Sequence, residues 1–306
     1  MTQPALPWQL PPSEPPSGVA YPQVLRTPTY SPARSLMGAL VALSAYLLVV
    51  PVVGQGLLAL FWWLRGQPDR ASYIRAASAY ELPEGLVAGH VALAMLIPIS
   101  LLVYRYAHAV APKWLASVQP GTRWRYLIAC LLVALVALNG VMWLSLLGKP
   151  WPFGQAQPGW VWFVAAIVVL SPLQAAAEEV FFRGYLFQAI GSLSVSRWLP
   201  VVASALLFAI FHGTQNLALF ADRFAFGLLA GFLVVLTGGI EAGIAAHVVN
   251  NLFAFGYAIF AGGVAHVKAI KQLTWADAAW DIAGFAAFAL LAWWVARKMR
   301  VATTTP

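Results

Sequence analysis

Long apolar runs are the feature that most restricts how this chain can fold. Beyond Arg34, successive stretches approach the roughly 20 residues that a helix needs to cross about 30 Å of hydrocarbon. We expect eight spanning helices, at about 36–62, 86–107, 126–147, 160–190, 198–212, 217–237, 239–261 and 279–296. The predicted fold is therefore all-α, a polytopic membrane bundle of about eight transmembrane helices.

The composition excludes a water-soluble domain. Only 9% of the residues are charged, whereas soluble domains have about 25%. The single cysteine, Cys130, excludes an intrachain disulfide and a cysteine-based zinc site. The net charge of +8 is spread between the apolar runs without a dense basic cluster. We therefore expect the excess of Lys and Arg to reflect membrane topology, and we expect no nucleic-acid partner.

The first 34 residues differ from the rest, because they hold nine of the 21 prolines. We predict a disordered, proline-rich tail over 1–34 and a transmembrane domain over 35–300. An even number of spans places both termini on one side. Ten Lys and Arg residues then fall in the segments on that side and seven on the other, so we expect cytoplasmic termini in a bacterial inner (plasma) membrane.

Three charged residues stand inside an apolar run, AAAEEVFFRGYLF, as Glu178, Glu179 and Arg183. At about 2.5–3.5 kcal/mol per charge, inserting them costs roughly 8–10 kcal/mol. We therefore expect them to face the bundle interior, pair with one another or line a wet cavity. Glu179 and Arg183 share a face at i, i+4 spacing and can pair. Glu178 lies about 100° around the helix and is left for another partner.

Two histidines and an asparagine occur in later runs. His212 ends the run ALLFAIFH, and His247 and Asn251 project from one face at i, i+4. With a rise of about 1.5 Å per residue, Glu178 and both histidines fall at overlapping depths. We expect them to meet in a cavity reached from the cytoplasm. A carboxylate, imidazoles and a carboxamide suit hydrolysis of an acyl bond, with Glu as general base and Asn stabilising an oxyanion.

No HExxH, GxSxG or GxGD motif is present. Instead, three motifs follow one another on successive apolar helices: Glu178-Glu179-x-x-x-Arg183-Gly184, Phe208-x-x-x-His212 and His247-x-x-x-Asn251. Together they resemble the CPBP family of intramembrane proteases, which includes type II CAAX prenyl endopeptidases and bacteriocin-immunity homologues. The resemblance covers about 160–262, which would be the catalytic core, and implies an intramembrane endopeptidase.

The resemblance also implies a role for each motif residue. Glu178 and His212 would activate the attacking water, with Phe208 packed beneath His212. Glu179 would support the site by pairing with Arg183. His247 and Asn251 would polarise the scissile carbonyl and hold the oxyanion.

The resemblance leaves the cofactor open. In one mechanism Glu178, His212 and His247 would hold a divalent metal such as zinc, and in the other the glutamate acts without a metal. The implied partners are membrane lipid and a membrane-anchored peptide or protein substrate. The motifs do not identify that substrate or say whether it must be prenylated.

Two other functions remain alternatives. The first is a non-catalytic relative that acts as a scaffold or confers immunity by binding. The second is a proton-coupled transporter, which the absence of an internal repeat disfavours. Single residues also have structural interpretations: Glu179–Arg183 as a structural ion pair, and His247 with Asn251 as an interhelical hydrogen-bonding pair. We expect His90 in the core, solvated positions for His108 and His266, and unremarkable acids beside turns at Asp222 and Glu241.

Overall fold

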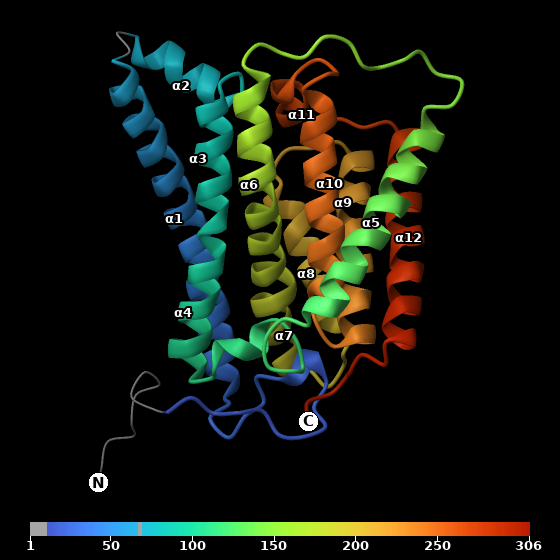
Figure 1. The fold of residues 1–306 in the computed structure, drawn as a ribbon. Coiled ribbons are helices and arrows are strands. Elements are labelled where there is room, and N and C mark those ends of the chain that lie inside the picture. Colours follow the sequence, from blue (N-terminus) through green and yellow to red (C-terminus); the bar gives the residue numbers. More distant parts are fainter. Residues whose placement is uncertain (1–10, 67–68) are drawn as a thin grey trace.

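The structure is a computed structural model that describes residues 11–66 and 69–306. In this part of the chain the helices run up and down in one bundle, and the only β-type pairings are isolated bridges (Figure 1). The all-α, polytopic fold predicted from the apolar runs is confirmed.

Eight passes make up the bundle: α1 (Pro32–Arg65), α3 (Pro83–Ala94) continued by α4 (Leu96–His108), α5 (Trp124–Ser145), α6 (Trp160–Glu179) continued by the π-helical η4 (Val180–Leu186) and α7 (Phe187–Ser192), α8 (Leu199–Phe211), α9 (Leu217–Thr237), α10 (Glu241–Ala258) and α12 (Trp275–Lys298). The shorter elements are η2 (Tyr21–Gln23), α2 (Arg70–Ser78), η3 (Pro112–Leu115) and α11 (Val264–Ala269).

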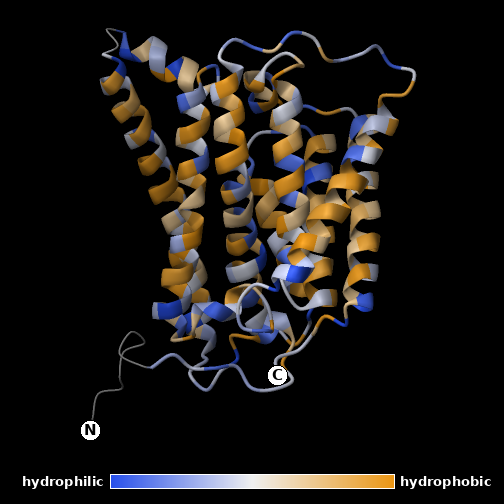
Figure 2. Cartoon of the chain, in the orientation of Figure 1, coloured by the Kyte–Doolittle hydropathy of each residue, from blue (hydrophilic) through white to orange (hydrophobic). Residues whose placement is uncertain are grey.

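Six of these passes are long and apolar enough to cross a membrane. The exceptions are α8, with 13 residues, and α10, with 18. Large apolar side chains are exposed on the bundle, for example Leu48, Val52 and Val136, which are 67%, 70% and 72% exposed. Figure 2 shows that hydrophobic residues predominate along the long helices. Such a surface is stable only against lipid, so the chain is a multi-pass membrane protein.

Local sequence explains where the helices end. The Ser31 side chain accepts a hydrogen bond from the backbone N–H of Arg34 and caps α1. Gly238, at φ 71°, ends α9 in the left-handed region, just before α10 begins at Glu241. The fourth pass stays α-helical through Pro172, and its irregularity comes later, where η4 widens the helix after Glu179.

Residues 11–31 are ordered, which corrects the prediction of a disordered tail over 1–34; residues 1–10 lie outside the described residues. Tyr21, Val24 and Leu25 are almost completely buried, and the Tyr21 hydroxyl donates to the carbonyl of Leu115. The number of prolines did not predict this order, because a few buried apolar side chains are enough to hold an extended segment against the bundle. The backbone of Ala20 also pairs with Thr304 near the C-terminus.

The first described residues and the C-terminus therefore lie at the same end of the bundle (Figure 1). This agrees with an even number of passes. Which side of the membrane that end faces stays a prediction.

Candidate active site

Glu178 and Glu179 are the last residues of α6 before the π-helical η4. A π-helical turn interrupts the regular hydrogen bonds of a helix and occurs often at functional sites. Nothing in the sequence analysis predicted this turn. Two carboxylates therefore stand at the point where the helix changes pitch, inside the bundle.

Glu179 belongs to a fully buried ion pair. Its Oε1 accepts a hydrogen bond from Nη1 of Arg183 at 3.1 Å, and both side chains are 0% exposed. The same oxygen accepts from Nδ1 of His247 at 2.9 Å. The Arg183 guanidinium stacks 4.0 Å from the centroid of the Phe208 ring. The pairing predicted from i, i+4 spacing is confirmed, and it also fixes the imidazole of His247.

Glu178 is placed differently from its neighbour. Its Oε1 accepts from Nε2 of Gln174 at 2.7 Å. Within the described residues its Oε2 has no hydrogen-bond partner, although Nε2 of His247 is 3.5 Å away. One oxygen of Glu178 is therefore held and the other is available.

Gln174 joins the site although the sequence analysis did not single it out. It is 5% exposed, and while it donates to Glu178, its Oε1 accepts from Nδ2 of Asn251 at 2.8 Å. The signal was available: Gln174 is polar, stands in an apolar helix and lies four residues before Glu178, on the same face.

His212 caps the C-terminus of α8, directly before Gly213 at φ 78°. Its Nδ1 is 2.7 Å from the backbone carbonyl oxygen of Phe208. A carbonyl only accepts, so Nδ1 carries the proton and Nε2 of the neutral ring is an acceptor. The Phe208 and His212 rings pack edge to face with centroids 4.4 Å apart, which confirms the predicted contact.

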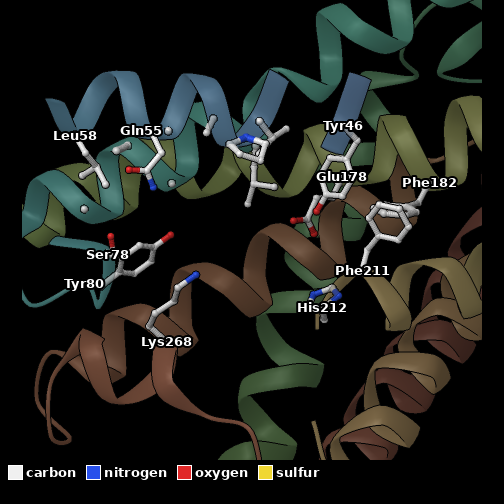
Figure 3. Close-up of a pocket in the computed structure, with 18 residues that line it drawn as sticks. Tyr46, Gln55, Leu58, Ser78, Tyr80, Glu178, Phe182, Phe211, His212 and Lys268 are labelled. Atoms are coloured by element: carbon white, nitrogen blue, oxygen red, sulfur yellow. The ribbon is translucent and has the colours of Figure 1, made fainter. Parts of the chain in front are cut away.

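Two adjoining cavities, of about 400 and 550 Å³, meet at this site. Glu178 and His212 line both and face one another across the smaller one (Figure 3). The larger cavity also reaches Gln174, His247 and Asn251. The structure thus brings Glu178, Glu179, Arg183 and His247 into direct contact, connects Asn251 through Gln174, and places His212 across the cavity.

The cavities extend toward the end of the bundle opposite the termini. Ser78 at the end of α2 and Lys268 on α11 line the smaller one, and both elements lie at that end (Figure 1). The cavities thus extend away from the termini, whereas we expected the termini and the entrance of the cavity on the same, cytoplasmic side.

The donor set for a metal has suitable chemistry but unsuitable placement. Glu178 offers a carboxylate oxygen, and His212 and His247 each offer Nε2 when neutral. In the described part of the chain, however, no group of three or more His, Cys, Asp or Glu side chains is placed to hold a metal ion. The residues do not fit a zinc site as they stand, and the zinc prediction stays untested.

Two histidines outside the motifs can be compared with the positions expected for them. His90 is in the core as predicted, 2% exposed, with Nε2 3.1 Å from the hydroxyl of Ser171. The solvated position expected for His108 is wrong: it is 4% exposed and contacts the Tyr185 hydroxyl.

The two acids beside turns are also corrected. Glu241 is completely buried in an ion pair with Arg123. Asp222 lines the larger cavity. Sequence position at the end of an apolar run did not reveal that the neighbouring loop folds over Glu241.

Comparison with known proteins places the site within a known domain. Residues 159–253 match the family described as "Type II CAAX prenyl endopeptidase Rce1-like". The chain is also 35% identical over 99 residues to "Uncharacterized protein YyaK" of Bacillus subtilis (strain 168), which covers 30% of this chain and 33% of that protein. The chain thus spans about a third of the length of this curated relative. No solved structure matches the chain described here.

Proposed function

We propose that the chain is an endopeptidase that hydrolyses a peptide bond of a membrane-anchored substrate, because residues 159–253 match the Rce1-like type II CAAX prenyl endopeptidase family. One observation carries the proposal. Glu178, with an unpartnered carboxylate oxygen, and His212, with an unprotonated Nε2, line the same cavity inside the bundle.

The first step is activation of water. A water between Glu178 Oε2 and His212 Nε2 donates one hydrogen bond to each, which points an oxygen lone pair at the substrate carbonyl. Its oxygen attacks the carbonyl carbon while Glu178 takes the proton. When the C–N bond breaks, the same proton passes from Glu178 to the leaving nitrogen, so the glutamate is restored.

His247 and Asn251 supply donors to the developing oxyanion. Because Nδ1 of His247 donates to Glu179, its Nε2 can donate only when the ring is an imidazolium. The Glu179 carboxylate stabilises the imidazolium of His247, and the guanidinium of Arg183 balances the charge of the second carboxylate. Asn251 has a second N–H beyond the one held by Gln174. Glu179, Arg183 and Gln174 are thus positioning residues, and none of them touches the substrate.

The substrate class follows from the location of the site. Glu178 lines two cavities inside a bundle of membrane-spanning helices, so we propose membrane lipid and a lipid-anchored or membrane-spanning peptide as partners. We further propose a bacterial inner membrane. Because the cavities extend toward the end away from the termini, cytoplasmic termini would place this end of the cavities on the outer side of that membrane.

The proposal is tested with two variants and two matched controls. Purified protein in detergent would be assayed on a fluorogenic library of membrane-anchored peptides. We expect Glu178→Gln and His212→Ala each to lower kcat/KM at least 100-fold, as for removal of a general base. Glu81→Gln and His266→Ala change an exposed acid and an exposed histidine outside the site, and should cleave like the wild type.

Each outcome of this assay has a consequence. Equal cleavage by all five proteins would overturn the assigned site. Cleavage abolished by a chelator and restored by zinc would establish the metal-dependent mechanism. If no peptide is cleaved while the wild type binds the library, the non-catalytic scaffold becomes the better account.

A further inference from the structure

Exposed cations gather where α5 begins and α12 ends, at the end of the bundle that carries the termini (Figure 1). Two contacts hold these helix ends together. The Tyr126 hydroxyl donates to the carbonyl of Ala292 at 3.1 Å, and Nη1 of Arg123 donates to the carbonyl of Ala302 at 3.0 Å. The basic surface that results consists of four exposed residues, Arg125, Arg297, Lys298 and Arg300.

The basic surface has no acidic partner. In the part of the chain that the structure describes, no carboxylate lies within 4.0 Å of its four side chains. The two acids at this end of the bundle, Glu14 and Glu241, are already paired with Lys113 and Arg123. Like charges that stand together repel one another, so an anion that binds here stabilises the surface.

The helix dipoles explain only part of this arrangement. Arg297 and Lys298 stand in the last turn of α12, where a cation is favourable. Arg125 instead stands in the first turn of α5, the positive end of that helix, and no acid accompanies it there. Its position is therefore unfavourable for the isolated helix and favourable for an anion outside it.

Arg300 is held in an unfavourable backbone conformation. Its φ of 52° lies in the left-handed region, at a position where helices usually carry Gly. Its N–H donates to the carbonyl of Arg297 at 3.2 Å, and the N–H of Val301 donates to that of Ala296 at 3.0 Å, the two bonds of a Schellman motif. Because a Cβ is disfavoured there, the chain carries a cation where the fold alone favours Gly.

Indole rings indicate the depth of the basic surface in the membrane. Trp124, Trp293 and Trp294 are exposed, and Trp is enriched where hydrocarbon meets headgroups. The Arg297 guanidinium lies 5.8 Å from the centroid of the Trp293 ring. The Lys298 ammonium lies 5.6 Å from that of Trp294. Figure 2 shows α12 changing from hydrophobic to hydrophilic at this end, which places the cations at the level of lipid phosphates.

We propose that the basic surface binds the headgroup of an anionic phospholipid. A guanidinium can donate two parallel hydrogen bonds to a phosphate, and an ammonium adds a point charge. A headgroup without a cation of its own fits this surface, whereas the ammonium of a zwitterionic lipid is repelled. Leu290 and Leu291, one to two turns before the cations, are exposed and would lie along the acyl chains, so the lipid is favoured over free phosphate. The inference does not depend on the proposed protease function.

The test measures how tightly lipids stay on the purified full chain. Protein in maltoside micelles would be titrated with phosphatidylglycerol or with phosphatidylcholine of the same acyl chains, and bound lipid counted by native mass spectrometry. We expect phosphatidylglycerol to bind at least tenfold more tightly at low ionic strength, and salt to reduce the difference. At about fivefold per cation, the double variant Arg297→Gln, Lys298→Gln should bind phosphatidylglycerol roughly 25-fold more weakly.

Arg300→Gly separates lipid binding from folding. It removes one cation and relieves the unfavourable φ, so we expect about fivefold weaker binding of phosphatidylglycerol with an unchanged or raised Tm. Arg70→Gln is the matched control. Arg70 is also exposed and lies 5.5 Å from an indole centroid, that of Trp62, but it stands at the opposite end of the bundle beside Asp69. This variant should bind phosphatidylglycerol like the wild type.

Several results would overturn the inference. One is equal binding of the two lipids by the wild type, and another is an Arg70→Gln variant that weakens binding as much as the double variant. Arg300→Gly with a lower Tm and unchanged lipid binding would show that Arg300 serves the fold alone. Inorganic phosphate at the concentration of the lipid should not displace phosphatidylglycerol; displacement would show a site for free anions instead.

Discussion

The ion pair between Arg123 and Glu241 allows a sharp prediction about stability. Arg123 precedes α5, and Glu241 is the first residue of α10. The carboxylate accepts from Nη2 at 2.6 Å, from Nε at 2.9 Å and from the backbone N–H at 3.0 Å. Nη1 of the same arginine donates to the carbonyls of Thr237 and Ala302. One guanidinium therefore joins α5, the α9–α10 turn and the C-terminal segment.

Burial decides how large the effect should be. The side chains of Arg123 and Glu241 are 9% and 0% exposed. The pair of Lys113 and Glu14 has a similar length, 2.9 Å, but is 47% and 51% exposed. Removing one partner of a buried pair leaves an uncompensated charge and costs about 3–5 kcal/mol. An exposed pair contributes about 0–1 kcal/mol.

We therefore expect Glu241→Met to lower the free energy of unfolding by about 3–5 kcal/mol and Lys113→Met to lower it by less than about 1 kcal/mol. The double variant Arg123→Met, Glu241→Met should be more stable than Glu241→Met alone, because it removes the stranded charge. Equilibrium unfolding in mixed micelles, followed by tryptophan fluorescence, measures all of these. Similar losses for Glu241→Met and Lys113→Met would refute the argument from burial.

Two further predictions concern the support of the site. A Cβ at Gly243 would lie 2.7 Å from Oε2 of Glu179, whereas a Cβ at Gly256 on the same helix would meet nothing within 4 Å. Gly243→Ala should therefore lower kcat at least tenfold by displacing the Glu179 carboxylate, and Gly256→Ala should leave kcat unchanged. Equal kcat values for the two variants would contradict the contact between Gly243 and Glu179. Gln174→Leu removes the donor to Glu178 and should lower kcat roughly tenfold with little change in KM; a rise in KM alone would show that Gln174 contacts substrate instead.

The passes and the main ion pair could be predicted because both follow from local rules. Each apolar run became a helix near the expected bounds, since a backbone in lipid must satisfy its own hydrogen bonds. Glu179 and Arg183 paired because i, i+4 spacing places them on one face within a single helix. The family motifs then selected Glu178, His212, His247 and Asn251.

The features that sequence reasoning missed depend on contacts between distant segments. The ordering of residues 11–31 needs the η3 segment as a docking surface, to which Tyr21 donates 94 residues away. The burial of Glu241 needs Arg123, 118 residues distant. The local sequence around Tyr21 and Glu241 does not indicate these distant partners. It therefore predicted a disordered tail for the first segment and an acid beside a turn for Glu241.

The shortness of α8 has a consequence for the surrounding bilayer. Its 13 residues reach about 20 Å, against about 30 Å of hydrocarbon. Its outer side chains Leu199, Val202 and Ile210 are exposed, and beyond His212 the wall continues as a loop with Thr214 and Gln215. Lipid beside α8 must become thinner to match, at a fraction of a kcal/mol per Å. We expect such thinning to bring water closer to His212, so that the acyl-chain length of the host membrane would control how readily a substrate reaches this histidine.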